Sequence, residues 1–94
     1  YLDKIPMLEG AKEALKKKVS SSLTYSNKSS INNSLNVLVK NKEYLNILFD
    51  PQTAGGFLFI VNRNHKIIKD LSDNDITFSE IGNISYNDNK IKIL

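Results

Sequence analysis

A polar turn that leads directly into an apolar run constrains the fold of this chain more than any other stretch. Residues 57–61 read Phe-Leu-Phe-Ile-Val, five consecutive aromatic or aliphatic side chains. A run of this length and composition is typical of a strand covered on both faces, so we expect an interior strand here. In the preceding residues 50–56, Pro51 fixes its own φ and keeps Asp50 out of the helical region. The sequence therefore predicts a shaped polar loop that feeds a buried strand.

Several residues of this loop are candidates for the edge of a ligand-binding site: Asp50, Gln52, Thr53, Gly55 and Gly56. Asp50 and Thr53 can hydrogen-bond nearby backbone, and the two glycines can take positive φ or let another group approach closely. Backbone amides of the glycines could also form an anion nest. A purely structural turn explains the same residues, with Asp50 as an acceptor for the backbone that follows it. Both interpretations stay open at this point.

The loop also carries a family resemblance. Residues 50–56, Asp-Pro-Gln-Thr-Ala-Gly-Gly, resemble the Asp-Pro-Gln-Thr-Ser-Gly-Gly signature of selenophosphate synthetases (selenide, water dikinases), which also precedes an apolar strand. Ala54 replaces the usual Ser and removes one hydroxyl. Residues 24–27 keep the Thr and the Asn of a second family segment but lack its Arg, and residues 2–8 resemble the segment before the family's helix. The resemblance runs from about Leu2 to the end of the chain.

The resemblance implies a function. The family makes selenophosphate from selenide, ATP and water, releasing AMP and phosphate, and shares its two-domain architecture with aminoimidazole ribonucleotide synthetase-like enzymes. Residues 1–94 would form the later, partial C-terminal domain, with residues 50–56 toward the cleft between domains. The implied partners are the N-terminal catalytic domain of the same polypeptide, a second subunit in a homodimer, and the substrates selenide and ATP.

The same resemblance implies that the catalytic groups lie elsewhere. In the family, carboxylates of the N-terminal domain bind ATP and magnesium, and a Gly-rich arm carries a catalytic Lys and a Cys or selenocysteine. None of these motifs occurs in this sequence. We therefore assign no catalytic or metal-binding residue to the chain and expect it to be inactive alone.

Composition narrows the remaining functions. The 94 residues suffice for one small domain. The absence of cysteine excludes disulfides and thiolate chemistry, and a single histidine, His65, excludes a multi-histidine metal site. Without an apolar run of membrane-spanning length or a signal-peptide pattern, the expected location is the cytoplasm. Because the chain begins with Tyr1 rather than Met, we expect a piece of a longer polypeptide.

Two alternatives to the enzyme interpretation stay open. The chain could be a non-catalytic interaction domain that keeps the fold, or a basic nucleic-acid-binding module that uses Lys16–Lys18. The net charge of +3 is modest, and no basic stretch interleaved with aromatic residues supports nucleic-acid binding. The lysines are better explained as a solvated helix end, where positive charge suits the helix dipole. His65 is best explained as a surface residue.

The patterning predicts an α+β fold with a small mixed or antiparallel sheet and helices packed on one side. Residues 31–41 fit either a helix or a strand. The other expected elements are helices over 7–19, 42–48 and 65–72 (the last capped by Asn64), a Ser-rich loop over 20–30, a turn at 73–75, strands over 57–61 and 76–79, and a C-terminal hairpin of 84–86 and 90–94 around a turn at 87–89.

Overall fold

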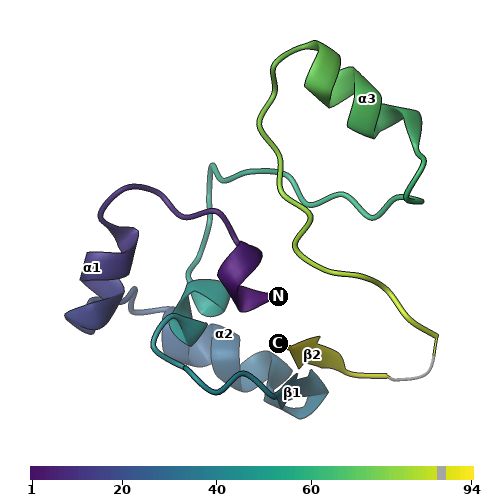
Figure 1. The fold of residues 1–94 in the computed structure, drawn as a ribbon. Helices are drawn as coiled ribbons and strands as arrows, with labels where there is room; N and C mark the ends of the chain where they lie inside the picture. Colours follow the sequence, from purple (N-terminus) through teal and green to yellow (C-terminus); the bar gives the residue numbers. More distant parts are fainter. Residues whose placement is uncertain (87–88) are drawn as a thin grey trace.

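The computed structural model describes residues 1–86 and 89–94. These residues form a small mixed α/β structure with three α-helices, three short 3₁₀ helices and two strands (Figure 1). In chain order the elements are η1 (Leu2–Lys4), α1 (Ala11–Lys16), α2 (Thr24–Ile31), η2 (Asn32–Ser34), β1 (Leu35–Val37), η3 (Leu45–Phe49), α3 (Lys66–Asp73) and β2 (Ile91–Ile93).

The sheet consists of β1 and β2, which pair in parallel with Leu35 opposite Ile91. The two N–H groups that follow β1 both donate to the Ile93 carbonyl oxygen, at 2.9 and 3.1 Å. The predicted hairpin is therefore wrong, because residues 84–86 form no strand and β2 pairs with a strand far back in the sequence. Alternating residues identify a strand but not its partner. The expected turn at 87–89 includes residues 87–88, which lie outside the described part.

The core lies where the two ends of the chain meet. Its buried side chains are Leu2, Leu45, Phe49 and Ile93, and half-buried apolar residues from β1 and η3 pack around them. The Leu2 N–H donates to the Leu94 carbonyl oxygen at 2.8 Å, which holds η1 beside the end of β2. The hydrophobic contacts that stabilise the fold thus join segments from the two ends and the middle of the chain.

Two helices are shorter than the sequence predicts. The helix expected over 7–19 is limited to α1, since Gly10 at its N-cap has a φ of 77° and interrupts the helical backbone. Lys18, with a φ of 59°, ends the helix on the other side. The helix expected over 42–48 is the 3₁₀ helix η3, and the ambiguous residues 31–41 contain η2 followed by β1.

The Ser-rich loop predicted for residues 20–30 is wrong, because most of it is helix α2. The helix has no apolar stripe by which the sequence could reveal it. Side-chain hydroxyls instead satisfy its backbone: Ser21 Oγ accepts from the Leu23 N–H at 3.2 Å, and Ser30 Oγ donates to the Asn27 carbonyl at 2.8 Å. Tertiary contact with η3 stabilises it further.

In the region between η3 and β2, the predicted strands over residues 57–61 and 76–79 are wrong. Residues 57–61 form no strand and are exposed, as are the apolar residues of 76–79, which form no strand either. The described residues offer these segments no strand to pair with, and apolar side chains alone do not create a sheet. Only α3 forms here, followed by the expected turn, in which Asp75 has a φ of 54°.

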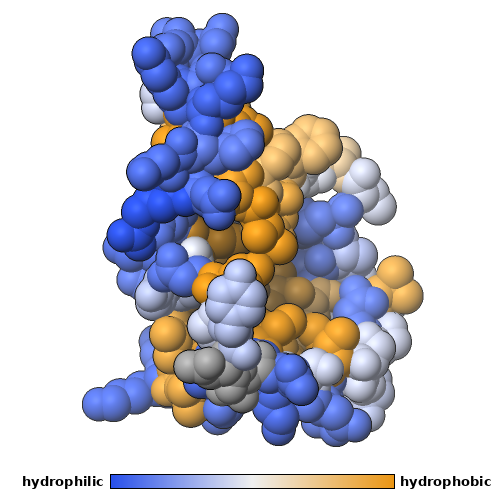
Figure 2. Space-filling model, turned by 90° about the vertical axis from the view of Figure 1, so that its right-hand side faces the viewer, coloured by the Kyte–Doolittle hydropathy of each residue, from blue (hydrophilic) through white to orange (hydrophobic). Residues whose placement is uncertain are grey.

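This region, residues 51–86, is named here the outer arm (Figure 1). It extends away from the core and returns to the N-terminus, where the Tyr1 amino group donates to the Ile81 carbonyl oxygen at 2.7 Å. The radius of gyration of 14.8 Å exceeds the roughly 12 Å typical of a compact domain of this length. Figure 2 shows the resulting apolar surface on one face of the molecule. None of the helices in the described residues is long and apolar enough to cross a membrane.

Candidate functional site

The 50–56 loop follows Phe49, a residue that is held in place by the core and by helix α2. Phe49 is buried in the core, and its carbonyl oxygen accepts a hydrogen bond from Asn27 Nδ2 of α2 at 2.9 Å. The Lys28 Nζ lies 5.7 Å from the centroid of the Phe49 ring, within the range of a cation–π contact. Helix α2 therefore positions the start of the loop, because Asn27 of one segment singled out by the family resemblance bonds to the residue directly before the other.

Within the loop, the Gln52 side chain connects Asp50 to Gly55. Asp50 has an extended backbone, with φ −70° and ψ 129°, as expected before Pro51. Its Oδ2 accepts from Gln52 Nε2 at 2.8 Å, so the recorded partner of the carboxylate is a side-chain amide rather than the following backbone. A Cβ added to Gly55 would lie 3.1 Å from Gln52 Cβ and 3.3 Å from its Oε1. Gly55 thus allows the close approach of Gln52.

The remaining candidates of the loop are not part of this arrangement. Gly56 lies in open space, with no atom within 4 Å of a Cβ built on it, and Thr53 is exposed. Neither Gly55 nor Gly56 adopts a positive φ. The structure therefore brings together Asp50, Gln52 and Gly55 through close approach, and not through left-handed backbone.

A hollow of about 190 Å³ lies next to the loop. Its apolar lining comes from α1 and η3 and includes Ala14, Leu15 and Ile47. Its polar lining consists of Asn46, Asp50, Thr24 at the first position of α2, and Ser20 and Ser21 shortly before that helix. The hollow thus joins the first residue of the loop to the N-terminal end of α2.

Thr24 is the residue of this hollow that sequence reasoning did not select. It was matched only as part of the second family segment, within a stretch expected to be a loop. In the structure it is 7% exposed, and its Oγ1 is buried with no hydrogen-bond partner among the described residues. A helical pattern in residues 24–31 would have identified it, but α2 lacks apolar periodicity.

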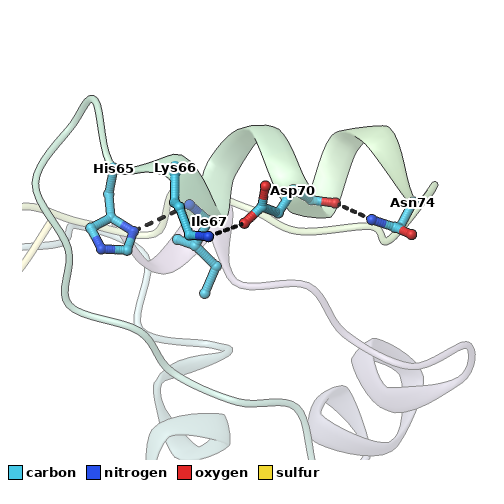
Figure 3. A network of polar contacts seen from close by, with 5 residues as sticks. All are labelled: His65, Lys66, Ile67, Asp70 and Asn74. Carbon is cyan, nitrogen blue, oxygen red and sulfur yellow. Dashed lines mark hydrogen bonds and ion pairs between the residues drawn. The ribbon is translucent and has the colours of Figure 1, made fainter.

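His65 has a structural role at the start of helix α3. It is the N-cap of α3, one residue later than the expected Asn64, and its Nδ1 accepts from the Ile67 N–H at 3.2 Å (Figure 3). Lys66 and Asp70 form an exposed ion pair at 3.7 Å, and Asn74 Nδ2 donates to the Asp70 carbonyl at 2.7 Å. The His65 and Asn74 bonds thus satisfy a backbone N–H at the start of the helix and a carbonyl oxygen near its end.

The chemistry available at the loop and the hollow is hydrogen bonding. It combines one carboxylate, two amide side chains and several hydroxyls, without a nucleophile placed against a base. Nowhere in residues 1–86 and 89–94 do three His, Cys, Asp or Glu side chains gather to hold a metal ion. The site is thus equipped to bind and orient a ligand.

Comparison with known proteins gives one relationship. No family model and no solved structure matches the chain. The chain is similar to the selenide, water dikinase of Caldanaerobacter subterraneus subsp. tengcongensis, with 35% identity over 60 residues, which are 64% of this chain. The chain spans about 17% of the length of that protein. This partial similarity supports a relationship between the chain and selenide, water dikinases.

Proposed function

We propose that this chain is part of the C-terminal domain of a selenophosphate synthetase and that its 50–56 loop borders the cleft facing the N-terminal catalytic domain. The observation that carries the proposal is the similarity to a selenide, water dikinase over 60 residues. The seven-residue resemblance of the loop to the family signature, with one difference at Ala54, supports it further.

The role of the loop in this proposal is positioning. Gln52 bonds to Asp50 and packs on Gly55, so the backbone of the loop has a defined shape before any ligand arrives. The described residues contain no cluster that fits a magnesium ion. We therefore assign ATP and magnesium to the N-terminal domain, and no chemical step to the residues of this chain.

The exposed apolar residues of the outer arm are consistent with a surface that packs against another domain. Phe57 and Ile60 are exposed although their side chains are apolar, and exposed apolar patches commonly mark interaction surfaces. The same observation favours a second candidate, a non-catalytic interaction domain. The polypeptide sequence upstream of Tyr1 separates the two: a Gly-rich arm with Lys and Cys or selenocysteine supports the enzyme, and its absence supports the interaction domain.

The direct test is selenide-dependent release of AMP from ATP. A polypeptide that carries this chain together with its N-terminal domain should release AMP only when selenide is present. The 94-residue chain alone should release none above background, because it has no cysteine and no described metal cluster. AMP release by the pure chain, or a lack of selenide dependence in the longer polypeptide, would contradict the proposal.

Two glycine variants of the longer polypeptide test the role of the loop. Gly55→Val should reduce selenophosphate formation more than it reduces thermal stability, since its Cβ displaces Gln52 from Asp50. Gly56→Val is the matched comparison for this contact, because the space around Gly56 is open and its φ is not positive, so the variant leaves Gln52 in place. If both variants lose activity only in proportion to the folded fraction, the loop is a structural turn.

A further inference from the structure

We propose that the polypeptide segment directly before Tyr1 forms a β-strand that pairs with the outer arm beside Ile81. Such a strand requires that the polypeptide continues before Tyr1, and in this respect it rests on the proposed function. It gives the exposed apolar side chains of residues 76–86 a partner in the adjoining segment of the same polypeptide, rather than in the N-terminal catalytic domain.

The N-terminus of the chain is held against the outer arm. The Tyr1 amino group donates to the Ile81 carbonyl oxygen at 2.7 Å, and Asn83 Nδ2 donates to the Tyr1 hydroxyl oxygen at 3.3 Å. When another residue precedes Tyr1, its nitrogen keeps one N–H, so the contact with Ile81 becomes a backbone bond of the kind that joins two strands. The preceding Cα lies about 3.8 Å from that of Tyr1. The segment before Tyr1 therefore starts beside the outer arm.

The backbone of the outer arm around Ile81 is available for a strand partner. Residues 76–85 form no helix, strand or turn and follow an extended path in Figure 1. Among residues 1–86 and 89–94, the Tyr1 amino group is the one main-chain donor to residues 77–86, and no N–H of residues 77–86 donates to another backbone group. Free N–H and C=O groups along an extended segment are a template for pairing with another strand.

Apolar side chains alternate along the same part of the outer arm. Four of them occupy even-numbered positions and are exposed: Ile76, Phe78, Ile84 and Tyr86. In an extended chain these positions lie on one face, and the odd-numbered face is polar here except for Ile81. The alternation is typical of a strand with one buried face. A neighbouring strand covers part of such a face through cross-strand pairs of side chains.

The adjoining segment is favoured over a partner that arrives from solution. The chain spans about 17% of the length of the selenide, water dikinase that it resembles. A longer polypeptide of the proposed kind has ample length for a strand of about six residues. A separate partner loses translational and rotational freedom when it binds, whereas the adjoining segment is already tethered at Ile81 through Tyr1.

The test is hydrogen exchange of the longer polypeptide, measured by mass spectrometry over residues 76–86. The comparison is a variant with two prolines in the roughly six residues before Tyr1, because proline has no N–H and is excluded from central strands. Residues 76–86 should exchange at least about tenfold more slowly in the intact polypeptide than in this variant. Helix α2, which contacts η3, is the internal control and should exchange equally in both.

Two substitutions in the outer arm provide a second measurement that leaves the preceding segment unchanged. Phe78→Asp places a charge on the apolar face that the strand covers, and should speed the exchange of residues 76–86 about tenfold. Ser79→Asp is the matched control, because it places the same charge on the polar face. It should change the exchange by less than about twofold.

Four outcomes would overturn the proposal. Fast exchange of residues 76–86 in the intact polypeptide would show that no strand pairs there. Protection that survives the prolines would assign the surface to another domain, and protection that rises with protein concentration would assign it to a second copy. Equal effects of Phe78→Asp and Ser79→Asp would show that the apolar face is not covered.

Selenide-dependent AMP release tests the proposed function separately. A longer polypeptide that releases no AMP but shows proline-sensitive protection of residues 76–86 would contradict the enzymatic function and support the strand pairing. A polypeptide that releases AMP with selenide but leaves residues 76–86 unprotected would contradict the strand pairing alone.

Discussion

The core and the outer arm contain similar apolar residues in opposite environments. Leu45 in η3 is 6% exposed, whereas Leu58 in the outer arm is 72% exposed. Phe49 and Phe57 differ in the same way. The core residues meet partners from the two ends of the chain, while residues 57–61 of the outer arm have no strand partner among the described residues. Burial is therefore decided by distant partners rather than by local composition.

The largest expected difference between the two regions is in the free energy of unfolding. Leu45→Ala should destabilise the protein by about 2–5 kcal/mol, as large-to-small changes in packed cores do. Leu58→Ala is the matched control and should change stability by less than about 0.5 kcal/mol, as at other exposed positions. Chemical denaturation measures both values. Comparable costs for the two variants would show that residues 57–61 are buried in solution, as the sequence alone predicts.

An intermediate effect is expected where α2 fixes the start of the outer arm. Asn27→Ala removes the bond to the Phe49 carbonyl and leaves this acceptor unsatisfied, at a cost of about 1–3 kcal/mol. Asn33→Ala, at an exposed position in η2, is the control and should have little effect. Thermal unfolding compares the variants. Equal melting temperatures would mean that the bond does not stabilise the attachment of the arm.

The smallest effect should be confined to the outer arm. His65→Ala removes the N-cap of α3 and should weaken this helix by about 0.5–2 kcal/mol, with little change in global stability. Hydrogen exchange of the α3 amides detects such local opening. Asn64→Ala is the control, because Asn64 is the cap expected from sequence and His65 is the cap observed. Faster exchange in Asn64→Ala alone would reverse that assignment.

The features that could be predicted from sequence are those set by neighbouring residues in the chain. The extended backbone at Asp50, the helical centre of α1, the body of α3 and the turn after it follow from Pro51, helical spacing and Asn/Asp chemistry. Of the loop residues selected from sequence, the structure connects Asp50, Gln52 and Gly55 to one another. The role at a cleft proposed for all five loop residues remains a prediction.

Features that depend on distant segments could not be predicted in this way. Helix α2 has no apolar periodicity, and its position depends on contact with η3. The parallel pairing of β1 with β2 requires two short segments from opposite halves of the chain. The hollow beside Thr24 exists only because α1, α2 and η3 meet, so no single stretch of sequence contains its signal.

The contact of Ile93 with Leu2 and Leu45 has a consequence for synthesis on the ribosome. At typical translation speeds of about 5–20 residues per second, roughly 5–18 s separate the appearance of Leu2 from that of Ile93. In the later part of this interval the growing chain already contains the apolar residues 57–61 but has neither β2 nor a completed core. This nascent state is therefore the one in which binding by a chaperone would matter most.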